Sequence, residues 1–413
     1  MGTLWLAKVA TSFGHPPNPP VTLSYFRLGW SQPDEEPSAE PLSQRFIRET
    51  GIHLKNLPVP EATLDQLALS RKLLEGGSGP DALGVDMIWA GVLAPDLMDL
   101  ETDLAAELPL LNPQLVSSYM VDGRLVAIPY QVQVGVLEYR TDLLRAYHYD
   151  HPPRTWDEME SMAARVQAGE RAKGNKNFWG YVWQGAAAEA LTCNALEWQA
   201  SEGGGQIIEA NRTISVNNPA AIRSWQRAKS WIGRISPPGV VAYRESDSIS
   251  VFDSGDALFH RVWGGAAVNR GGLSHRSHER NTLAVDKTGY TSLPSGRAGS
   301  AGTLGGSGLA ISRRSAHPRE AVRLVRFLIR AEIAAHAKGQ PEPAGASSDD
   351  DSGIVIRPSS VTGRQYEQVT NAYIAAVHGV LTGNKKAPEA AADLETNLAQ
   401  ITGFGKGPPK TTE

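Results

Sequence analysis

The chain has 413 residues, 41% of them hydrophobic and 20% charged, with a formal net charge of -4. This length predicts two domains of roughly 150–200 residues each, and the apolar content excludes a chain that is disordered throughout. Lys and Arg are scattered along the sequence and no apolar run approaches ~20 residues, which excludes a nucleic-acid footprint and a membrane-spanning helix.

The N-terminal residues 1–19 are expected to form a disordered tail. The apolar stretch Thr3–Ala7 is too short for the core of a signal peptide, and no basic residue precedes it. A proline-rich segment, Gly14–Pro20, then leads to the first strand signal. We expect either that the export signal has been removed from this chain or that Met1 is not the native start.

Strand and helix signals alternate in the first part of the chain. Val21–Arg27 alternates apolar and polar residues, as in a strand, and a helical stretch over Ala39–Arg48 follows. A second strand is expected near Ile52–Leu57, then a helix over Leu64–Glu75 that ends in a glycine-rich stop. Val85–Trp89 has the composition of a buried strand. This order is typical of an α/β lobe with a largely parallel sheet.

Two extended runs, Arg124–Pro129 and Val134–Tyr139, precede a second helical series. Thr155-Trp-Asp-Glu158 is a capping box, in which the Thr hydroxyl accepts a helix N–H and the Glu reaches back. Asn218-Pro219 is another helix start, with Asn as the cap and Pro in the first turn. The only cysteine, Cys193, excludes an internal disulfide; we expect it to be buried in a helix, with a reactive thiol as the alternative.

The last part of the chain begins with an extended, Gly/Ser-rich segment, Tyr290–Ser312, and continues with an apolar helix over Ala321–Ile329. Gln340–Gly353 is low in complexity and is expected to be a mobile loop. Two helices close the chain, and their apolar faces comprise Tyr366, Val369, Tyr373, Val377 and Val380 in one and Ala391, Leu394, Leu398 and Ile401 in the other.

A series of short motifs follows one another along most of the chain. They are Asp86-Met-Ile-Trp89, Leu125-Val-Ala-Ile-Pro129, Tyr139-Arg-Thr-Asp-Leu-Leu144, Pro152-Pro-Arg-Thr-Trp-Asp-Glu158, Phe178-Trp-Gly-Tyr-Val-Trp-Gln-Gly185, Ile235-Ser-Pro-Pro-Gly239, Thr303-Leu-Gly-Gly306 and Arg357-Pro-Ser359. In this order they resemble the extracellular solute-binding proteins of ABC carbohydrate importers, close to the trehalose/maltose-binding branch.

The resemblance implies an α/β chain with the two-lobed periplasmic-binding-protein fold of type II. In this fold, crossing hinge segments join the lobes and the ligand lies in the cleft between them. Lobe 1 is expected to comprise residues 20–130 and 288–338, and lobe 2 residues 131–287 and 339–413. Opening and closing is then a hinge motion, and a ligand that contacts both lobes stabilises the closed form.

The implied function is to bind a di- or oligosaccharide and deliver it to the membrane subunits of an ABC importer. Neither catalysis, metal, cofactor nor nucleic acid is expected to be involved. The protein is expected to be a periplasmic or extracellular monomer, associated with lipid or membrane in a Gram-positive host. One alternative is a glycoside hydrolase with paired carboxylates such as Glu35 and Asp86, which must lie ~5–9.5 Å apart. Another is a binding protein that serves a chemoreceptor or sensor kinase.

A sugar site needs hydrogen-bonding groups for the hydroxyls and aromatic rings for the apolar face of the sugar. The resemblance assigns these roles to eight residues, namely Glu35, Asp86, Gln131, Gln133, Trp263, Gly306, Ser307 and Arg357. Each of four has a simpler alternative. Glu35 could lie in a solvated acidic loop, and Asp86 could cap a helix. Trp263 could pack in the core, and Arg357 could form an ion pair between the lobes.

Some of these positions depart from the family pattern. Gln131 and Gln133 stand where an aromatic residue and an acid are usual, Ser307 replaces a Trp, and Gly265 replaces a Tyr. The loss of rings and of one charge predicts a roomier, less charged pocket. Such a pocket suits a larger oligosaccharide, a substituted sugar or a weakly bound disaccharide, so the identity of the sugar stays open.

Other patterns do not indicate catalysis or metal binding. The glycine runs Gly203–Gly205 and Gly302–Gly308 lack the Lys-Ser/Thr of a phosphate-binding loop and are expected to be turns. His275 and His278 could hold a metal but are expected in a solvated loop. None of the ten His residues belongs to a nucleophile motif such as GxSxG.

Overall fold

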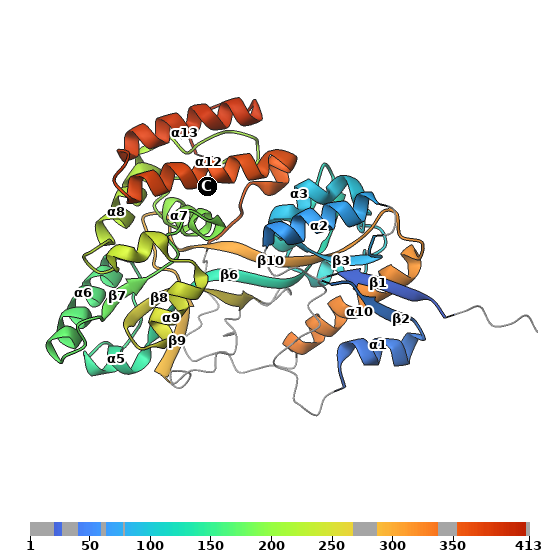
Figure 1. Cartoon of the computed structure of the whole chain (residues 1–413), viewed down its shortest axis with the longest axis horizontal. Helices are drawn as coiled ribbons and strands as arrows, with labels where there is room; N and C mark the ends of the chain where they lie inside the picture. Colours follow the sequence, from blue (N-terminus) through green and yellow to red (C-terminus); the bar gives the residue numbers. More distant parts are fainter. Residues whose placement is uncertain are drawn as a thin grey trace, which may run out of the picture.

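A mixed nine-stranded β-sheet runs through the middle of the molecule (Figure 1). The structure is a computed structural model that describes residues 20–26, 40–58, 63–76, 79–266, 287–337 and 353–409. The strand order is β2-β1-β3-β10-β6-β8-β7, with β11 paired to β10 and β9 paired to β6. The strands are β1 (Thr22–Phe26), β2 (His53–Asn56), β3 (Ala82–Asp86), β6 (Ile128–Arg140), β7 (Trp179–Val182), β8 (Ala257–Ala266), β9 (Thr288–Ser292), β10 (Ala301–Ile311) and β11 (Gly353–Val355). A small separate sheet contains β4 (Met120–Val121) and β5 (Arg124–Leu125).

The first lobe is built on β1, β2 and β3, which pair in parallel as the sequence predicts. In Figure 1, helices α2 (Thr63–Glu75) and α3 (Ala90–Leu93) lie on one side of these strands, and α1 (Leu42–Thr50) and α10 (Pro318–Ala337) on the other. Their apolar faces meet in one core cluster that includes Phe26, Phe46, Leu83, Leu309 and Leu328.

The second lobe surrounds β7, β8 and β9 with helices. These are α5 (Thr141–Ala146), α6 (Trp156–Ala172), α7 (Glu189–Ser201), α8 (Pro219–Trp231), α9 (Glu245–Asp253), α12 (Tyr366–Leu381) and α13 (Ala387–Thr402). A second core cluster fills this lobe, and indole rings pack edge to face inside it, with ring centroids 5.0 Å apart for Trp183 and Trp198. Eleven of the 13 residues of α7 are buried, so this helix lies inside the lobe.

Strands β6, β8 and β10 each pass from one core to the other. In β8, Phe259 belongs to the second core and Val262 to the first. In β6, residues up to Val136 belong to the first core and Leu137 belongs to the second. In β10, Ala301 belongs to the second core and Leu304 to the first. The α/β architecture with two lobes and crossing segments is therefore the one that the family resemblance implies.

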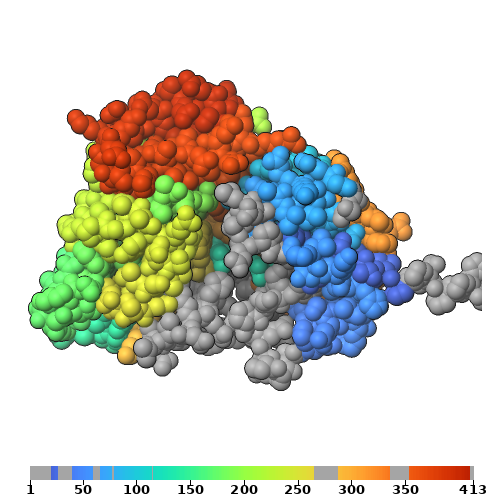
Figure 2. Space-filling view, in the orientation of Figure 1, coloured from blue at the N-terminus to red at the C-terminus, as the bar shows by residue number. Residues whose placement is uncertain are grey.

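The C-terminal part of the chain makes a third connection. Figure 2 shows α12 and α13, in red, along the second lobe and reaching toward the first lobe, in blue. The short helix α11 (Ser359–Thr362) packs on α3, where the Ser359 hydroxyl donates to the Met87 carbonyl oxygen at 3.0 Å. A Cβ on Gly91 would lie 2.4 Å from the Ser359 carbonyl oxygen, so only glycine permits this approach.

Several local predictions are confirmed. The Asn218 side chain accepts the Ala220 and Ala221 N–H groups at the start of α8. Thr155 caps α6 by accepting the Glu158 N–H, although the Glu158 carboxylate reaches the Arg154 N–H instead of the cap residue. Cys193 is buried in α7, and burial raises the pKa of its thiol to about 12, which leaves it unreactive.

One strand prediction is wrong in part. The run Val85–Trp89 was expected to be a single buried strand, but β3 ends at Asp86 and a 3₁₀ helix, η1 (Met87–Trp89), follows. The Asp86 carboxylate accepts the Ile88 N–H and so starts the helix. Burial alone cannot distinguish a strand from a helical turn over three consecutive apolar residues, which explains the error. Most of the predicted loop 340–353, as well as His275 and His278, lies outside the described residues.

Candidate functional site

Polar side chains form a row across three neighbouring strands near the middle of the sheet. In the strand register, Asp86 of β3 pairs with Ser307 of β10, and Ser307 pairs with Gln131 of β6. Gln133 pairs with Gly305, one pleat further along. Residues opposite each other on paired strands project from the same face of a sheet, so these side chains lie side by side. All four are partly exposed, although most of their neighbours in the three strands are buried.

The strand β10 is distorted where it carries this row. Gly306 has φ +103, and a Cβ there would lie 1.9 Å from the Gln131 carbonyl oxygen. The pairing between β10 and β6 then shifts by one residue after Ser307. Gly306 therefore contributes backbone and space to the row, and no side chain can replace it without moving β6.

Asp86 has the structural role that the sequence left as an alternative. Its Oδ1 accepts the Ile88 N–H at 3.2 Å as the cap of η1. The same side chain stands at the end of the polar row, at the carboxyl end of a parallel strand, where ligands of α/β proteins usually bind. The two roles are compatible because a carboxylate has two oxygens.

Trp263 lies beside the row and is partly exposed. It pairs with Gly135 of β6, and its ring lies over Gly305 of β10, where a Cβ would come within 2.7 Å of the ring. The Arg261 guanidinium lies 4.1 Å from the ring centroid. The indole thus presents an apolar surface next to Gln133, as a ring that stacks on a sugar would.

Arg357 forms an ion pair with Glu189, but both residues fall within the expected lobe 2, so this is not the interlobe pair that was its alternative assignment. Its Nη1 lies 2.9 Å from Glu189 Oε1 at the start of α7, and only 5% of the residue is exposed. Glu189 also accepts hydrogen bonds from Tyr366 and Thr370. Burial by itself would lower the pKa of Arg357, but nearby ionisable groups, Glu189 and Asp86 among them, raise it well above its ordinary value. The guanidinium therefore stays charged close to Asp86.

The structure brings six of the eight predicted residues together in one place and shows Arg357 near them in an ion pair. Glu35 lies outside the described residues. Two residues next to this site were not predicted from the sequence, namely Glu197 of α7 and Arg261 of β8. The proximity of Arg261 to Trp263 could have been predicted, because residues 261 and 263 of one strand project from the same face.

A second polar network has the hydrogen-bonding order of a hydrolase triad. His260 Nε2 lies 3.1 Å from Ser248 Oγ, and its Nδ1 lies 3.0 Å from the Glu138 carboxylate. All three residues are buried, and the Ser248 hydroxyl donates to the Glu245 carbonyl oxygen. A nucleophile must be reachable and must direct its proton to the histidine, so we assign this network a structural role.

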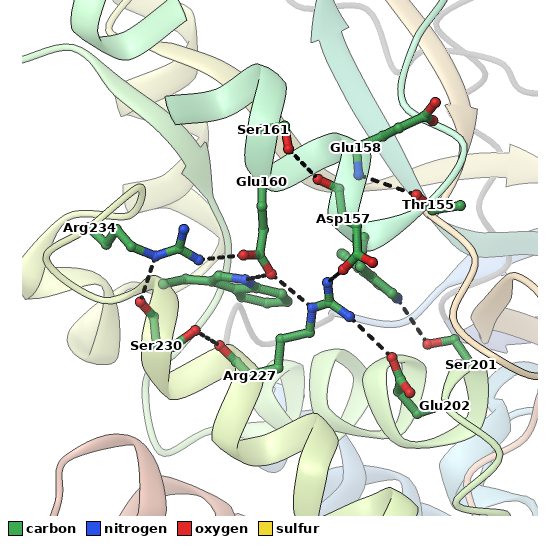
Figure 3. Close-up of polar contacts among 12 residues, drawn as sticks. Thr155, Asp157, Glu158, Glu160, Ser161, Ser201, Glu202, Arg227, Ser230 and Arg234 are labelled. Atoms are coloured by element: carbon green, nitrogen blue, oxygen red, sulfur yellow. Dashed lines mark hydrogen bonds and ion pairs between the residues drawn. The ribbon is translucent and has the colours of Figure 1, made fainter. Parts of the chain in front are cut away.

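A third cluster connects α6 and α8 on the second lobe (Figure 3). The Arg227 guanidinium contacts Asp157, Glu160 and Glu202. Glu160 also accepts from Trp231 Nε1 at 2.8 Å and pairs with Arg234. These are fixed contacts between helices, and none involves a residue of the polar row. Among the described residues, no group of three His, Cys, Asp or Glu could hold a metal ion, and no helix is long and apolar enough to cross a membrane.

Comparison with known proteins identifies related chains. Residues 30–335 match the bacterial extracellular solute-binding protein family. A probable ABC transporter-binding protein of Deinococcus radiodurans is 37% identical over 382 residues, which cover 87% of this chain and 89% of that protein.

Solved structures of binding proteins are also similar to this chain. Maltose-bound MalE3 of T. maritima superposes with a TM-score of 0.72 and 27% identity, over 92% of this chain and 100% of that chain. The GacH receptor of Streptomyces glaucescens, studied unliganded and with acarbose, has a TM-score of 0.72 at 18% identity, over 94% of this chain and 100% of that chain. These similarities confirm the predicted two-lobed fold.

Proposed function

The chain belongs to the bacterial extracellular solute-binding protein family, and on this premise we propose that it binds a di- or oligosaccharide between its lobes and delivers it to the membrane subunits of an ABC importer. The observation that carries the proposal is the polar row of Asp86, Ser307, Gln131 and Gln133 beside the partly exposed ring of Trp263. Hydroxyl groups require both donors and acceptors, which the amides, the hydroxyl and the carboxylate supply. The indole offers a surface for the C–H face of a sugar.

The site we propose comprises these five residues with Gly306, and Glu35 and Arg357 as further candidates. Arg357 would contact the ligand only if it changed partner from Glu189, or used its Nε, which is buried without a hydrogen-bond partner in the described part of the chain. We place the cleft between the two lobes. Lobe 1 comprises residues 20–130 and 288–338, and lobe 2 comprises residues 131–287 and 339–413. Core membership within β6 changes at Val136 and Leu137, slightly beyond the proposed boundary at residue 130.

We further propose that the protein does not hydrolyse its ligand. A glycosidase needs two carboxyl groups on either side of the scissile bond. Among the described residues Asp86 is the one carboxylate of the polar row, while Glu189 and Glu197 are engaged in ion pairs with arginines. As a carrier, the protein would act as a monomer outside the cytoplasmic membrane and, in a Gram-positive host, be attached to it.

A saccharide panel tests the proposal. Purified protein is heated with maltose, maltotriose, trehalose, larger oligosaccharides and monosaccharides, and the solution is then assayed for released sugar. A ligand at 100 times its Kd adds about 2.7 kcal/mol of stability, which a thermal-shift assay resolves. Stabilisation without released sugar is expected. Release of glucose would make the protein an enzyme, and the absence of binding to any saccharide would overturn the proposal.

A further inference from the structure

The ring of Trp263 is held from two directions. Its six-membered part covers Gly305, and the Arg261 guanidinium lies 4.1 Å from the ring centroid. Trp263 and Arg261 are two residues apart in β8, so they project from the same face and the guanidinium can stack on the indole. A ring that packs on a glycine and stacks against a guanidinium has little rotational freedom, and the part of it that remains exposed is the surface a ligand can contact.

Arg261 is itself fixed by a carboxylate from the inside of the second lobe. Its Nε and Nη2 donate to the two oxygens of Glu197 at 3.1 and 2.5 Å, and both residues are 0% exposed. Glu197 Oε1 also accepts the Thr303 N–H of β10 at 3.1 Å. The Glu197 carboxylate of α7 therefore fixes the position of the Arg261 side chain of β8 relative to the backbone of β10.

The backbone leaves room for this pair at one position. A Cβ on Gly135, which is the strand partner of Trp263, would lie 2.0 Å from Glu197 Oε1 and 2.5 Å from Arg261 Nη2. Glycine at 135 thus allows the ion pair to lie directly on β6. A fully buried ion pair contributes little net stability compared with apolar packing, so its value lies in the geometry that it imposes.

We propose that Glu197 and Arg261 are positioning residues, which hold the Trp263 ring in place before a saccharide arrives. The inference rests on the proposed function in that Trp263 is taken to contact the ligand. A preformed platform raises affinity because less side-chain freedom is lost on binding. Arg261 acts through its stack on the ring, and Glu197 acts through Arg261.

A double-mutant cycle with maltose as the probe tests the proposal. The variants are Glu197→Gln, Trp263→Ala and the two combined, and the Kd is measured by calorimetry. Glu197→Gln is close in shape and keeps an oxygen for the Thr303 N–H, but it removes the counter-charge of the buried Arg261, so the folded fraction of each variant is checked by urea denaturation before the Kd is measured. We expect Glu197→Gln to weaken maltose binding about threefold to tenfold, as loss of a cation–π stack would. In the Trp263→Ala background the same change should have no further effect.

A spectroscopic readout makes the test independent of any ligand. The protein has ten tryptophans, and fluorine NMR of fluorotryptophan-labelled protein separates them. The Trp263 resonance is the one missing from Trp263→Phe. In the free protein, Glu197→Gln should shift or broaden this resonance while distant ones, such as Trp225, stay unchanged.

Glu160→Gln is the matched control, because it removes a carboxylate from another ion-pair cluster of the same lobe (Figure 3). It should leave maltose affinity and the Trp263 resonance unchanged. If Glu197→Gln fails to fold, Arg261→Lys replaces it, since lysine retains the charge but not the planar stack.

The outcomes separate the two proposals. Wild-type maltose affinity in Trp263→Ala would count against Trp263 as a ligand contact, and the NMR result would then decide the positioning role. If the wild type does not bind maltose, the cycle is measured with the best ligand of the saccharide panel. Equal losses from Glu197→Gln in both backgrounds, or an unmoved Trp263 resonance, would overturn the positioning role itself.

Discussion

Asp86 is the residue at which ligand binding and local stability can be separated. Its Oδ1 caps η1 through the Ile88 N–H, and its strand partner is Ser307 of the polar row. Asp86→Ala removes both the cap and the carboxylate. Asp86→Asn keeps an acceptor for the Ile88 N–H, because Asn and Asp are equally good helix caps.

The two effects have different expected sizes. Loss of a cap costs about 0.5–2 kcal/mol of unfolding free energy. Loss of the partner of a buried sugar hydroxyl costs about 1–3 kcal/mol of binding free energy, which corresponds to a rise in Kd of roughly 5- to 150-fold. We expect Asp86→Ala to lose both stability and affinity. Asp86→Asn should lose affinity with nearly unchanged stability.

Urea denaturation measures the first quantity, and calorimetric titration with the best ligand of the saccharide panel measures the second. Wild-type affinity in both variants would remove Asp86 from the binding site and leave it as a cap alone. Wild-type stability of Asp86→Ala would show that the hydrogen bond to Ile88 contributes nothing. If the loss of binding free energy equals the loss of unfolding free energy in both variants, Asp86 does not have separate roles in binding and in capping.

Three further predictions concern the surroundings of the site. Gly306→Ala should destabilise the protein by about 1–3 kcal/mol more than Gly299→Ala, as measured by urea denaturation. Both glycines have positive φ, but only a Cβ at residue 306 would meet a neighbouring atom, the Gln131 carbonyl oxygen. Equal losses of unfolding free energy in the two variants would contradict this. Burial raises the pKa of Glu160, but hydrogen bonds from Trp231, Arg234 and Arg227 outweigh it and lower the pKa below its ordinary value. The stability that the lowered pKa of Glu160 provides is present above the unfolded-state pKa and is lost as the pH falls. The unfolding free energy of Glu160→Gln should therefore decline less toward pH 3 than that of the wild type. Parallel declines in the two proteins would refute this. Cys193, buried with its pKa raised to about 12, should resist DTNB in the native protein and react in concentrated urea, and rapid native labelling would disprove its burial.

Much of the fold could be predicted because local signals and motif order agree with it. The caps at Thr155 and Asn218, the parallel strands of the first lobe and the closing helices each follow from a few neighbouring residues. The pairing of Asp86, Ser307 and Gln131 does not, since these residues are far apart in the sequence and strand register is a property of the folded sheet. Only the resemblance to a family placed them together.

The ion pairs show where prediction from sequence ends. The ion-pair partner of Arg357 could not be predicted, because Glu189 is 168 residues away and no local pattern connects the two residues. The sequence alone does not single out Glu197, because a glutamate in a helix is usually solvated. The surrounding sequence of α7, with apolar or small residues on all sides, contained the relevant hint that this carboxylate had to be buried with a partner.

The position of the Glu197–Arg261 pair connects the binding site to the joint between the lobes. In β8, Phe259 belongs to the second core and Val262 to the first, so Arg261 lies at the change. Thr303, whose N–H Glu197 accepts, lies at the corresponding change in β10, between Ala301 and Leu304. The pair thus occupies the place where apolar packing passes from one lobe to the other, and the Trp263 ring stacks directly on it. The same ion pair therefore contacts both the proposed ligand platform and the strands that pass between the two cores.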